Sequence, residues 1–129
     1  MSKQILVVED QEDNRRILRD LLTSAGFDLV EATTGEEGVT LAETHHPDLI
    51  LMDIQLPGLD GYETTRRIKA NPALHQIPII AVTSYALSGD EVKAKQAGCD
   101  AYVTKPFSPR ALLAKVREYL REGDAGGPR

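Results

Sequence analysis

The sequence predicts an α/β domain in which a parallel five-stranded sheet is covered by helices on both faces. Five apolar segments of strand length alternate with five segments of helical pattern along the 129 residues. Such alternation is typical of right-handed strand–helix–strand units, whose strands run parallel. The most apolar segment, residues 49–52, is uninterrupted and ends on Asp53. A continuous run of this kind indicates a central strand buried on both faces.

Composition and charge restrict the class of protein. The chain has the length of one domain, and its 41% hydrophobic and 27% charged residues are ordinary for a globular protein. No apolar run approaches the roughly 20 residues of a membrane span, and the N-terminal run is too short for a signal peptide. A net charge of −5 without a basic run argues against nucleic acid or an anionic membrane as the main partner. A single cysteine, Cys99, excludes an internal disulfide. We therefore expect a cytoplasmic domain.

The first strand and helix are predicted by an apolar run and a helical stripe. Residues 5–8 are continuously apolar and are followed at once by Glu9 and Asp10. A helix is expected over 13–25, with Gly26 just past its end, where glycine is favoured. Its expected buried face consists of apolar residues at helical spacing: Ile17, Leu18, Leu21, Leu22 and Ala25.

A second strand and helix precede the central strand. Residues 27–32 have the composition of a strand but contain two acids, so this strand should be less deeply buried. Thr34 and Glu37 have the spacing of a capping box. The helix that they open should end near His45, because Pro47 follows.

Two helices and one strand are expected after Asp53. A helix over about 60–70 is opened by Asp60, and a strand over 77–82 is followed by Thr83. The next helix, 88–97, begins with the capping spacing of Ser88 and Glu91. It has few residues for a buried face: Val92, Ala94 and Ala97.

The last strand and helix complete the domain. The strand covers 101–104 and is followed by Lys105, while Ser108 as N-cap and Pro109 as first helical residue open the helix. Its expected buried stripe is Leu112, Leu113, Val116, Tyr119 and Leu120. The polar segment 123–129 should be a flexible tail, which leaves 1–122 as the domain.

Polar residues follow four of the five strands: Glu9 with Asp10, Asp53, Thr83 and Lys105. In a parallel sheet these strand ends lie on one edge, where open α/β sheets bind ligands. Like charges about 4 Å apart repel by roughly 4 kcal/mol at an effective dielectric near 20, so one lysine cannot balance three acids. A raised carboxylate pKa or a bound hard cation would resolve the repulsion, and Mg²⁺ suits such an oxygen-rich site.

Charge also suggests a role for each residue. Asp10, Asp53 and the backbone carbonyl of Gln55 would hold Mg²⁺, while Thr83 and Lys105 would hold the oxygens of a phosphoryl group. Asp53 is the acid nearest the centre of the sheet. We therefore predict that it is the nucleophile and forms an aspartyl phosphate.

Four short motifs resemble the receiver domain of two-component response regulators. They are Val-Val-Glu-Asp at 7–10, Leu-Met-Asp-Ile-Gln-Leu-Pro-Gly-Leu-Asp-Gly at 51–61, Ala-Val-Thr at 81–83 and Tyr-Val-Thr-Lys-Pro at 102–106. The resemblance covers residues 3 to about 122 and is greatest to single-domain receivers of the DivK kind. It implies a flavodoxin-like fold with strand order 2-1-3-4-5, bound Mg²⁺, and a cis peptide before Pro106. It also implies phosphoryl transfer from a phosphohistidine to Asp53.

The resemblance further implies a phosphorelay function. A sensor histidine kinase or a histidine phosphotransfer protein would be the donor, a downstream protein the output, and the chain a monomer or weak dimer. The protein would lose its phosphoryl group slowly and would not act as a turnover enzyme. Thr83 and Tyr102 match the switch residues, although Tyr102 could instead simply cover the sheet edge. Glu9 replaces an aspartate common in the family, so its water-mediated metal contact is the least secure.

Two other functions compete with this interpretation. A flavodoxin-type binder of a phosphate-bearing cofactor would need a Gly- or Ser/Thr-rich loop after the first strand, where this chain has acids. An aspartate-based phosphohydrolase would need a second Asp two residues after the nucleophile, where Gln55 stands. The cognate kinase and output partner stay open. Met1 and the polar tail favour a free-standing receiver.

Overall fold

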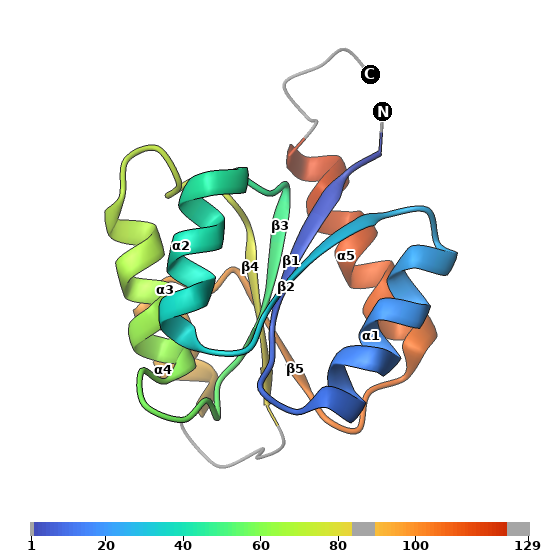
Figure 1. Cartoon of the computed structure of the whole chain (residues 1–129), viewed down its shortest axis with the longest axis horizontal. Coiled ribbons are helices and arrows are strands. Elements are labelled where there is room, and N and C mark those ends of the chain that lie inside the picture. Colours follow the sequence, from blue (N-terminus) through green and yellow to red (C-terminus); the bar gives the residue numbers. More distant parts are fainter. Residues whose placement is uncertain (1, 84–89, 124–129) are drawn as a thin grey trace.

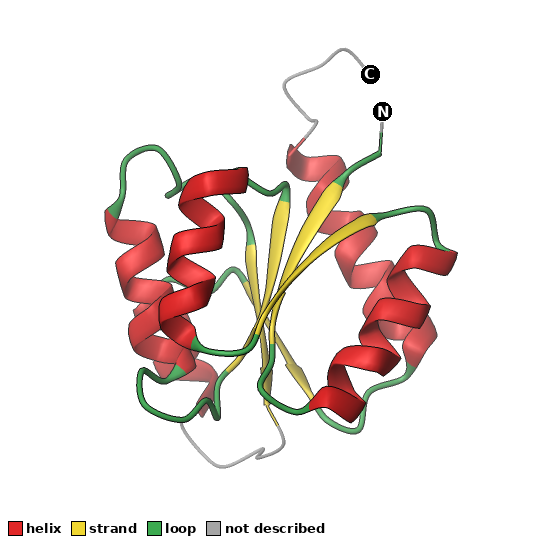
Figure 2. Cartoon of the chain, in the orientation of Figure 1, coloured by secondary structure: helices red, strands yellow, loops and turns green. Residues whose placement is uncertain are grey.

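The five strands form one parallel sheet with helices on both faces (Figures 1 and 2). The structure is a computed structural model that describes residues 2–83 and 90–123. Its strands are β1 (Gln4–Val8), β2 (Asp28–Ala32), β3 (Leu49–Asp53), β4 (Ile79–Thr83) and β5 (Ala101–Thr104). Their order is β2-β1-β3-β4-β5, which confirms the expected doubly wound, flavodoxin-like arrangement.

The helices divide between the two faces. They are α1 (Glu12–Ser24), α2 (Gly35–His45), α3 (Gly61–Ala70), α4 (Asp90–Ala97) and α5 (Pro109–Gly123). Figure 1 shows α1 and α5 on one side of the sheet and the other three helices on the opposite side. Successive residues of the central strands alternate between two cores: Leu6 packs on the side of α2 to α4, whereas Ile5 packs on the side of α1 and α5. Continuous apolar runs are therefore buried on both faces, as predicted.

Side-chain caps are present at the N-termini of three helices. The side-chain oxygens of Thr34, Asp60 and Ser108 accept hydrogen bonds from the amides of Glu37, Glu63 and Ala111. In α2 the Glu37 carboxylate accepts from the amide of Thr33 at 2.7 Å, one residue before the cap. The predicted cap Ser88 lies outside the described residues. Each cap satisfies an amide that a helix start otherwise leaves without a partner.

Two predictions of buried side chains are wrong. Ile17 is 53% exposed and Val92 is 57% exposed. In α1 the row formed by Leu18 and Leu22 faces the sheet, and Ile17 lies beside it. Among the side chains of α4 that the structure describes, Ala94 is fully buried and Ala97, one turn further along, is nearly so. A periodic pattern identifies an apolar stripe, but only the packing shows how much of its width is covered.

The ends of several elements are also refined by the structure. β4 begins at Ile79, two residues later than predicted, because the amide of Ile77 bonds to the carbonyl of Leu74 in the preceding turn. Gly26 has φ +96° just after α1, and the peptide before Pro106 is cis, both as expected. α5 includes Gly123, the first residue of the predicted tail, and 124–129 lie outside the described residues. Within the described part of the chain, no helix has the length and apolarity of a membrane span.

Candidate functional site

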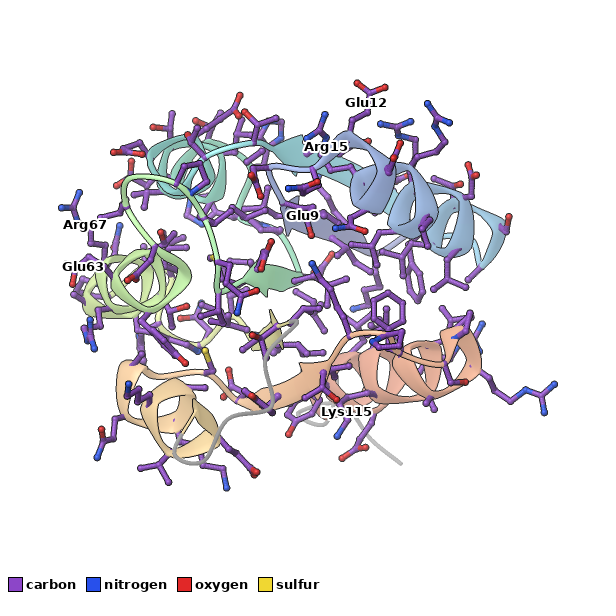
Figure 3. All side chains as sticks on the ribbon, turned by 90° about the horizontal axis from the view of Figure 1, so that it is seen from below. Glu9, Glu12, Arg15, Glu63, Arg67 and Lys115 are labelled. Atoms are coloured by element: carbon purple, nitrogen blue, oxygen red, sulfur yellow. The ribbon has the colours of Figure 1, made fainter. Side chains whose placement is uncertain are left out.

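Three predicted acids meet at the carboxyl edge of the sheet, the edge seen in Figure 3. Glu9 and Asp10 follow β1, and Asp53 is the last residue of β3. One carboxylate oxygen from each lies within 4.8 Å of the others. Glu9 and Asp53 are buried, at 2% and 5% exposure, while Asp10 is half-buried. The parallel sheet thus brings together acids separated by more than 40 positions in the chain.

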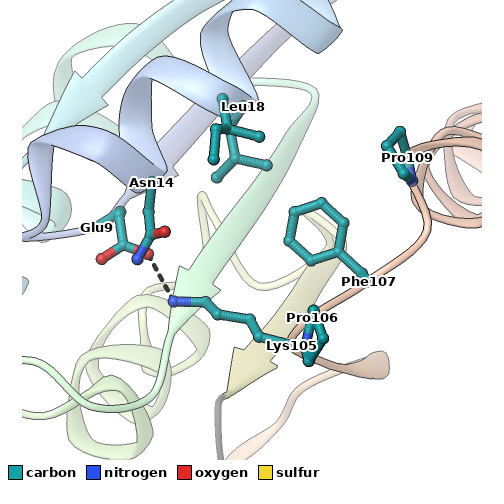
Figure 4. Close-up of a pocket in the computed structure, with 8 residues that line it drawn as sticks. Glu9, Asn14, Leu18, Lys105, Pro106, Phe107 and Pro109 are labelled. Atoms are coloured by element: carbon teal, nitrogen blue, oxygen red, sulfur yellow. Dashed lines mark hydrogen bonds and ion pairs between the residues drawn. The ribbon is translucent and has the colours of Figure 1, made fainter.

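Lys105 bridges the two buried acids from the end of β5. Its Nζ lies 2.9 Å from Oε1 of Glu9 and 3.6 Å from Oδ2 of Asp53. Figure 4 shows the shorter of these contacts. The lysine therefore pairs most directly with Glu9 and leaves Asp53 only partly compensated.

This asymmetry gives the two buried carboxyls opposite pKa shifts. Burial, then the negative charge of Glu9 and a hydrogen bond with it, raise the pKa of Asp53 to about 6, against the weaker effect of Lys105. Burial also disfavours the charged form of Glu9. Hydrogen bonds from Lys105, from Asp53 and from the Gln11 amide outweigh that burial, so the pKa of Glu9 lies below its usual value. Glu9 is thus the ionised member of the pair, and Asp53 is the acid that holds a proton near pH 6.

Gln55 links Asp53 to Thr83 at this end of the sheet. Thr83, the last residue of β4, is buried, and its Oγ1 accepts a hydrogen bond from Nε2 of Gln55 at 2.6 Å. The backbone amide of Gln55 donates a hydrogen bond to Oδ1 of Asp53 at 3.0 Å. Sequence reasoning considered only the carbonyl of Gln55 and missed its side chain. The feature of the sequence that could have indicated this side chain is its position two residues after Asp53, at the end of a strand.

Tyr102 lies on β5 opposite Ala81 of β4. Its side chain is half-buried and packs against the core on the side of α2 to α4. Tyr102 thus lies on the last strand, which the sequence predicted over 101–104. The switch role of Tyr102 stays a prediction.

An apolar cavity of about 490 Å³ opens beside Glu9 and Lys105. Its other lining residues come from α1, from the segment that joins β5 to α5 and from the start of α5: Asn14, Ile17, Leu18, Pro106, Phe107 and Pro109 (Figure 4). The exposed Ile17 therefore lines this cavity. A charged pair thus lies next to an apolar cavity wall.

The donor set suits a hard divalent cation. Three carboxylates within reach of one point offer the oxygen ligands that Mg²⁺ prefers. A cation there would also oppose the burial and the charge of Glu9 that raise the pKa of Asp53. A carboxylate, a lysine and a hydroxyl at one sheet edge are groups that can take part in phosphoryl transfer.

Comparisons with known proteins agree with this geometry. The sequence model of the family "Response regulator receiver domain" matches residues 5–117. The chain is 45% identical over 125 residues to the polar-differentiation response regulator DivK of Brucella ovis, covering 97% of this chain and 100% of that protein. The DivK protein of Brucella anthropi is 44% identical over the same length.

Solved structures show the same fold. A response regulator receiver domain protein, described as CheY-like, from Methanospirillum hungatei JF-1 has a TM-score of 0.91 and 33% identity, covering 98% of this chain and 100% of that one. The receiver domain of a sensor histidine kinase from Pseudomonas aeruginosa PAO1 has a TM-score of 0.87 and 38% identity, covering 93% of this chain and 98% of that one. That structure has a magnesium ion coordinated in its active-site cleft.

Proposed function

The chain belongs to the response regulator receiver domain family of two-component systems, and on that basis we propose that Asp53 accepts a phosphoryl group from a phosphohistidine. The family is a signalling domain and not a class of turnover enzymes. The observation that carries the proposal is the meeting of Glu9, Asp10 and Asp53 within 4.8 Å, with the Lys105 ammonium 3.6 Å from Asp53.

The roles follow from the positions of these groups. An oxygen of ionised Asp53 attacks phosphorus, a P–O bond forms as the P–N bond of the donor breaks, and the electron pair returns to the donor imidazole. Lys105 balances charge on the transferred group, and Thr83 donates its hydroxyl to one of the oxygens. The oxygen of Thr83 accepts a hydrogen bond from Gln55, and its hydroxyl hydrogen would be donated to the phosphoryl group.

The acids fit the metal that this chemistry needs. Asp10, Asp53 and the backbone carbonyl of Gln55 would hold Mg²⁺ directly, and Glu9 through water. Bound Mg²⁺ would neutralise phosphoryl oxygens and keep Asp53 ionised. A sensor kinase or a histidine phosphotransfer protein is the donor that we propose, and a protein partner reads the phosphorylated state. The phosphoryl group is then lost slowly by hydrolysis.

Acetyl phosphate provides a direct test. With Mg²⁺, intact-protein mass spectrometry should show one added phosphoryl group on the parent and none on Asp53→Asn. The label should also disappear on incubation without acetyl phosphate. Equal labelling of parent and variant would refute the assignment of Asp53. Multiple turnover of an aryl phosphate would favour a phosphohydrolase instead.

A further inference from the structure

Arg15, in α1, reaches back to the turn that joins β1 to α1. Its Nη1 donates to the backbone carbonyl oxygens of Glu9 and Asp10, at 3.0 and 3.1 Å. Figure 3 labels Glu9 and Arg15, and both lie at the edge of the sheet that carries the site. One guanidinium nitrogen therefore fixes the main chain of both acids that follow β1. Sequence reasoning gave Arg15 no role.

A second strand holds Arg15 in place. Its Nε lies 3.5 Å from Oε1 of Glu31 on β2, and Arg19 donates to both oxygens of the same carboxylate at 2.7 and 2.8 Å. The hydrogen bonds from Arg19, against the opposing effect of burial, and the charges of both arginines keep the pKa of Glu31 below its usual value. Glu31 is thus ionised and offsets the charge of Arg15. The side chain of Arg15 is 14% exposed, against 60% for its neighbour Arg16.

The shape of the guanidinium matters in this arrangement. Its planar fork directs Nη1 toward the two carbonyls and Nε toward Glu31 at the same time. A lysine ammonium is a compact point charge and cannot span both partners in this way. Arg15 therefore joins α1, β2 and the turn that carries the acids.

We propose that Arg15 is a positioning residue for the metal site: it fixes the peptide groups of Glu9 and Asp10 so that their carboxylates face Asp53. The proposal rests on the Mg²⁺ site of the proposed function. Charge and geometry give opposite signs here. If Arg15 acted only through its charge, its removal would leave the site more negative and Mg²⁺ would bind more tightly. If it positions the acids, its removal weakens Mg²⁺ binding.

The test compares Arg15→Gln and Arg15→Lys with Arg16→Gln, the control at an exposed neighbour. Magnesium titrations followed by NMR, at conditions where each variant is folded, should give a dissociation constant about 10-fold higher for both Arg15 variants. Outer residues that orient metal ligands typically contribute about 10- to 100-fold to affinity. We expect Arg15→Lys to bind Mg²⁺ as weakly as Arg15→Gln does, although the lysine keeps the positive charge. The control should match the parent.

A second readout needs no metal. The amide of Gln11 donates to Oε2 of Glu9 at 3.1 Å, so hydrogen exchange at this amide reports how firmly Glu9 is held. In metal-free protein it should accelerate at least several-fold in the Arg15 variants and not in Arg16→Gln.

The outcomes separate this inference from the proposed function. Unchanged or tighter Mg²⁺ binding, or Gln11 exchange at the parent rate, would overturn the positioning role. If the parent itself binds no Mg²⁺, the proposed function fails, while the exchange measurement still decides whether Arg15 holds Glu9. If the Arg15 variants do not fold, Glu31→Gln, which keeps Arg15 but removes its ionic partner, should shift both readouts in the same direction by a smaller factor. No shift in either would overturn the inference.

Discussion

Lys105 lies closer to one of the two buried carboxyls than to the other, a difference that the sequence does not indicate. Its ammonium contacts Glu9 at 2.9 Å and Asp53 at 3.6 Å. Glu9 consequently keeps its charge, and the pKa of Asp53 rises to about 6, chiefly because of burial and then the charge of Glu9. The residue proposed to accept the phosphoryl group is therefore the one whose ionisation responds most to a bound cation.

This pKa shift has a consequence for stability without metal. Asp53 titrates near 4 in an unfolded chain and near 6 in the folded one, so folding favours its protonated form. Its stabilising contribution is fully present below pH 4 and is lost as the pH rises through 6. Relative to Asp53→Asn, the free energy of unfolding of the parent should fall by roughly 2–3 kcal/mol between pH 4 and 7.

Urea unfolding in EDTA across this pH range checks the prediction. A constant difference between the parent and Asp53→Asn across this range would mean that Asp53 is ionised throughout in the folded protein.

The acids Glu9 and Asp10 should differ in their effect on metal binding. If Asp10 binds Mg²⁺ directly and Glu9 through water, Asp10→Asn should raise the Mg²⁺ concentration needed for phosphorylation by acetyl phosphate more than Glu9→Gln does. The Mg²⁺ dependence of the phosphorylation rate measures both. Equal losses would show that the direct and water-mediated roles are misassigned.

At the scale of elements, α3 and α2 each pack closely against the sheet at a glycine. The neighbouring atoms are backbone in α3 and side chain in α2. A Cβ on Gly61, the first residue of α3, would lie 2.3 Å from the backbone oxygen of Asp53. A Cβ on Gly38, inside α2, would lie 2.9 Å from a methyl group of Val8. Movement of the Asp53 backbone displaces the site itself, whereas crowding of Val8 disturbs only the packing of the core.

We therefore expect Gly61→Ala to destabilise the protein by about 2 kcal/mol or more and to slow phosphorylation of Asp53, since α3 must move off the end of β3. Gly38→Ala is the matched variant. There the gain in helix propensity, about 1 kcal/mol, offsets much of the crowding. Chemical denaturation with the acetyl phosphate assay measures both effects. Similar losses for the two variants would contradict the backbone argument.

At the scale of the whole molecule, the described residues of α4 bury little apolar surface. In the described part of this helix the buried side chains are Ala94 and Ala97, whose small apolar area contributes little free energy, and Val92 is exposed. Phosphorylation of Asp53 adds charge and acceptor oxygens at the end of β3, which pairs with β4. Movement of Thr83 onto the phosphoryl group, with Tyr102 turning inward, would then shift the population of α4 and the adjoining surface of β5 and α5.

Amide hydrogen exchange with Mg²⁺ and beryllofluoride, a phosphoryl mimic, tests this coupling. Exchange should change in the described parts of 83–120, mainly in α4 and β5, and should stay the same in α2. Asp53→Asn with the same additives is the control and should show no change. Changes restricted to 12–45 would place the response on the wrong side of the sheet and contradict the prediction.

Most of the fold was determined by local features of the sequence. Continuous apolar runs gave β1 and β3, because a strand covered on both faces has no position for a polar side chain. The spacing of Thr34 with Glu37 marked a helix start, because a cap involves neighbours within one turn. Convergence of the acids followed from parallel strands alone, whose carboxyl ends must share an edge.

Tertiary structure alone decided the features that depend on distances between residues far apart in the chain. It gave the charge of the buried pair to Glu9, because Lys105, 96 residues away, lies closer to it. It linked Gln55 to Thr83 across two strands, and it left Ile17 at the rim of a cavity. It also placed Arg15 against the carbonyls of Glu9 and Asp10. Periodicity and motifs describe neighbours along the chain, whereas these contacts are set by how far each side chain reaches across the packed sheet.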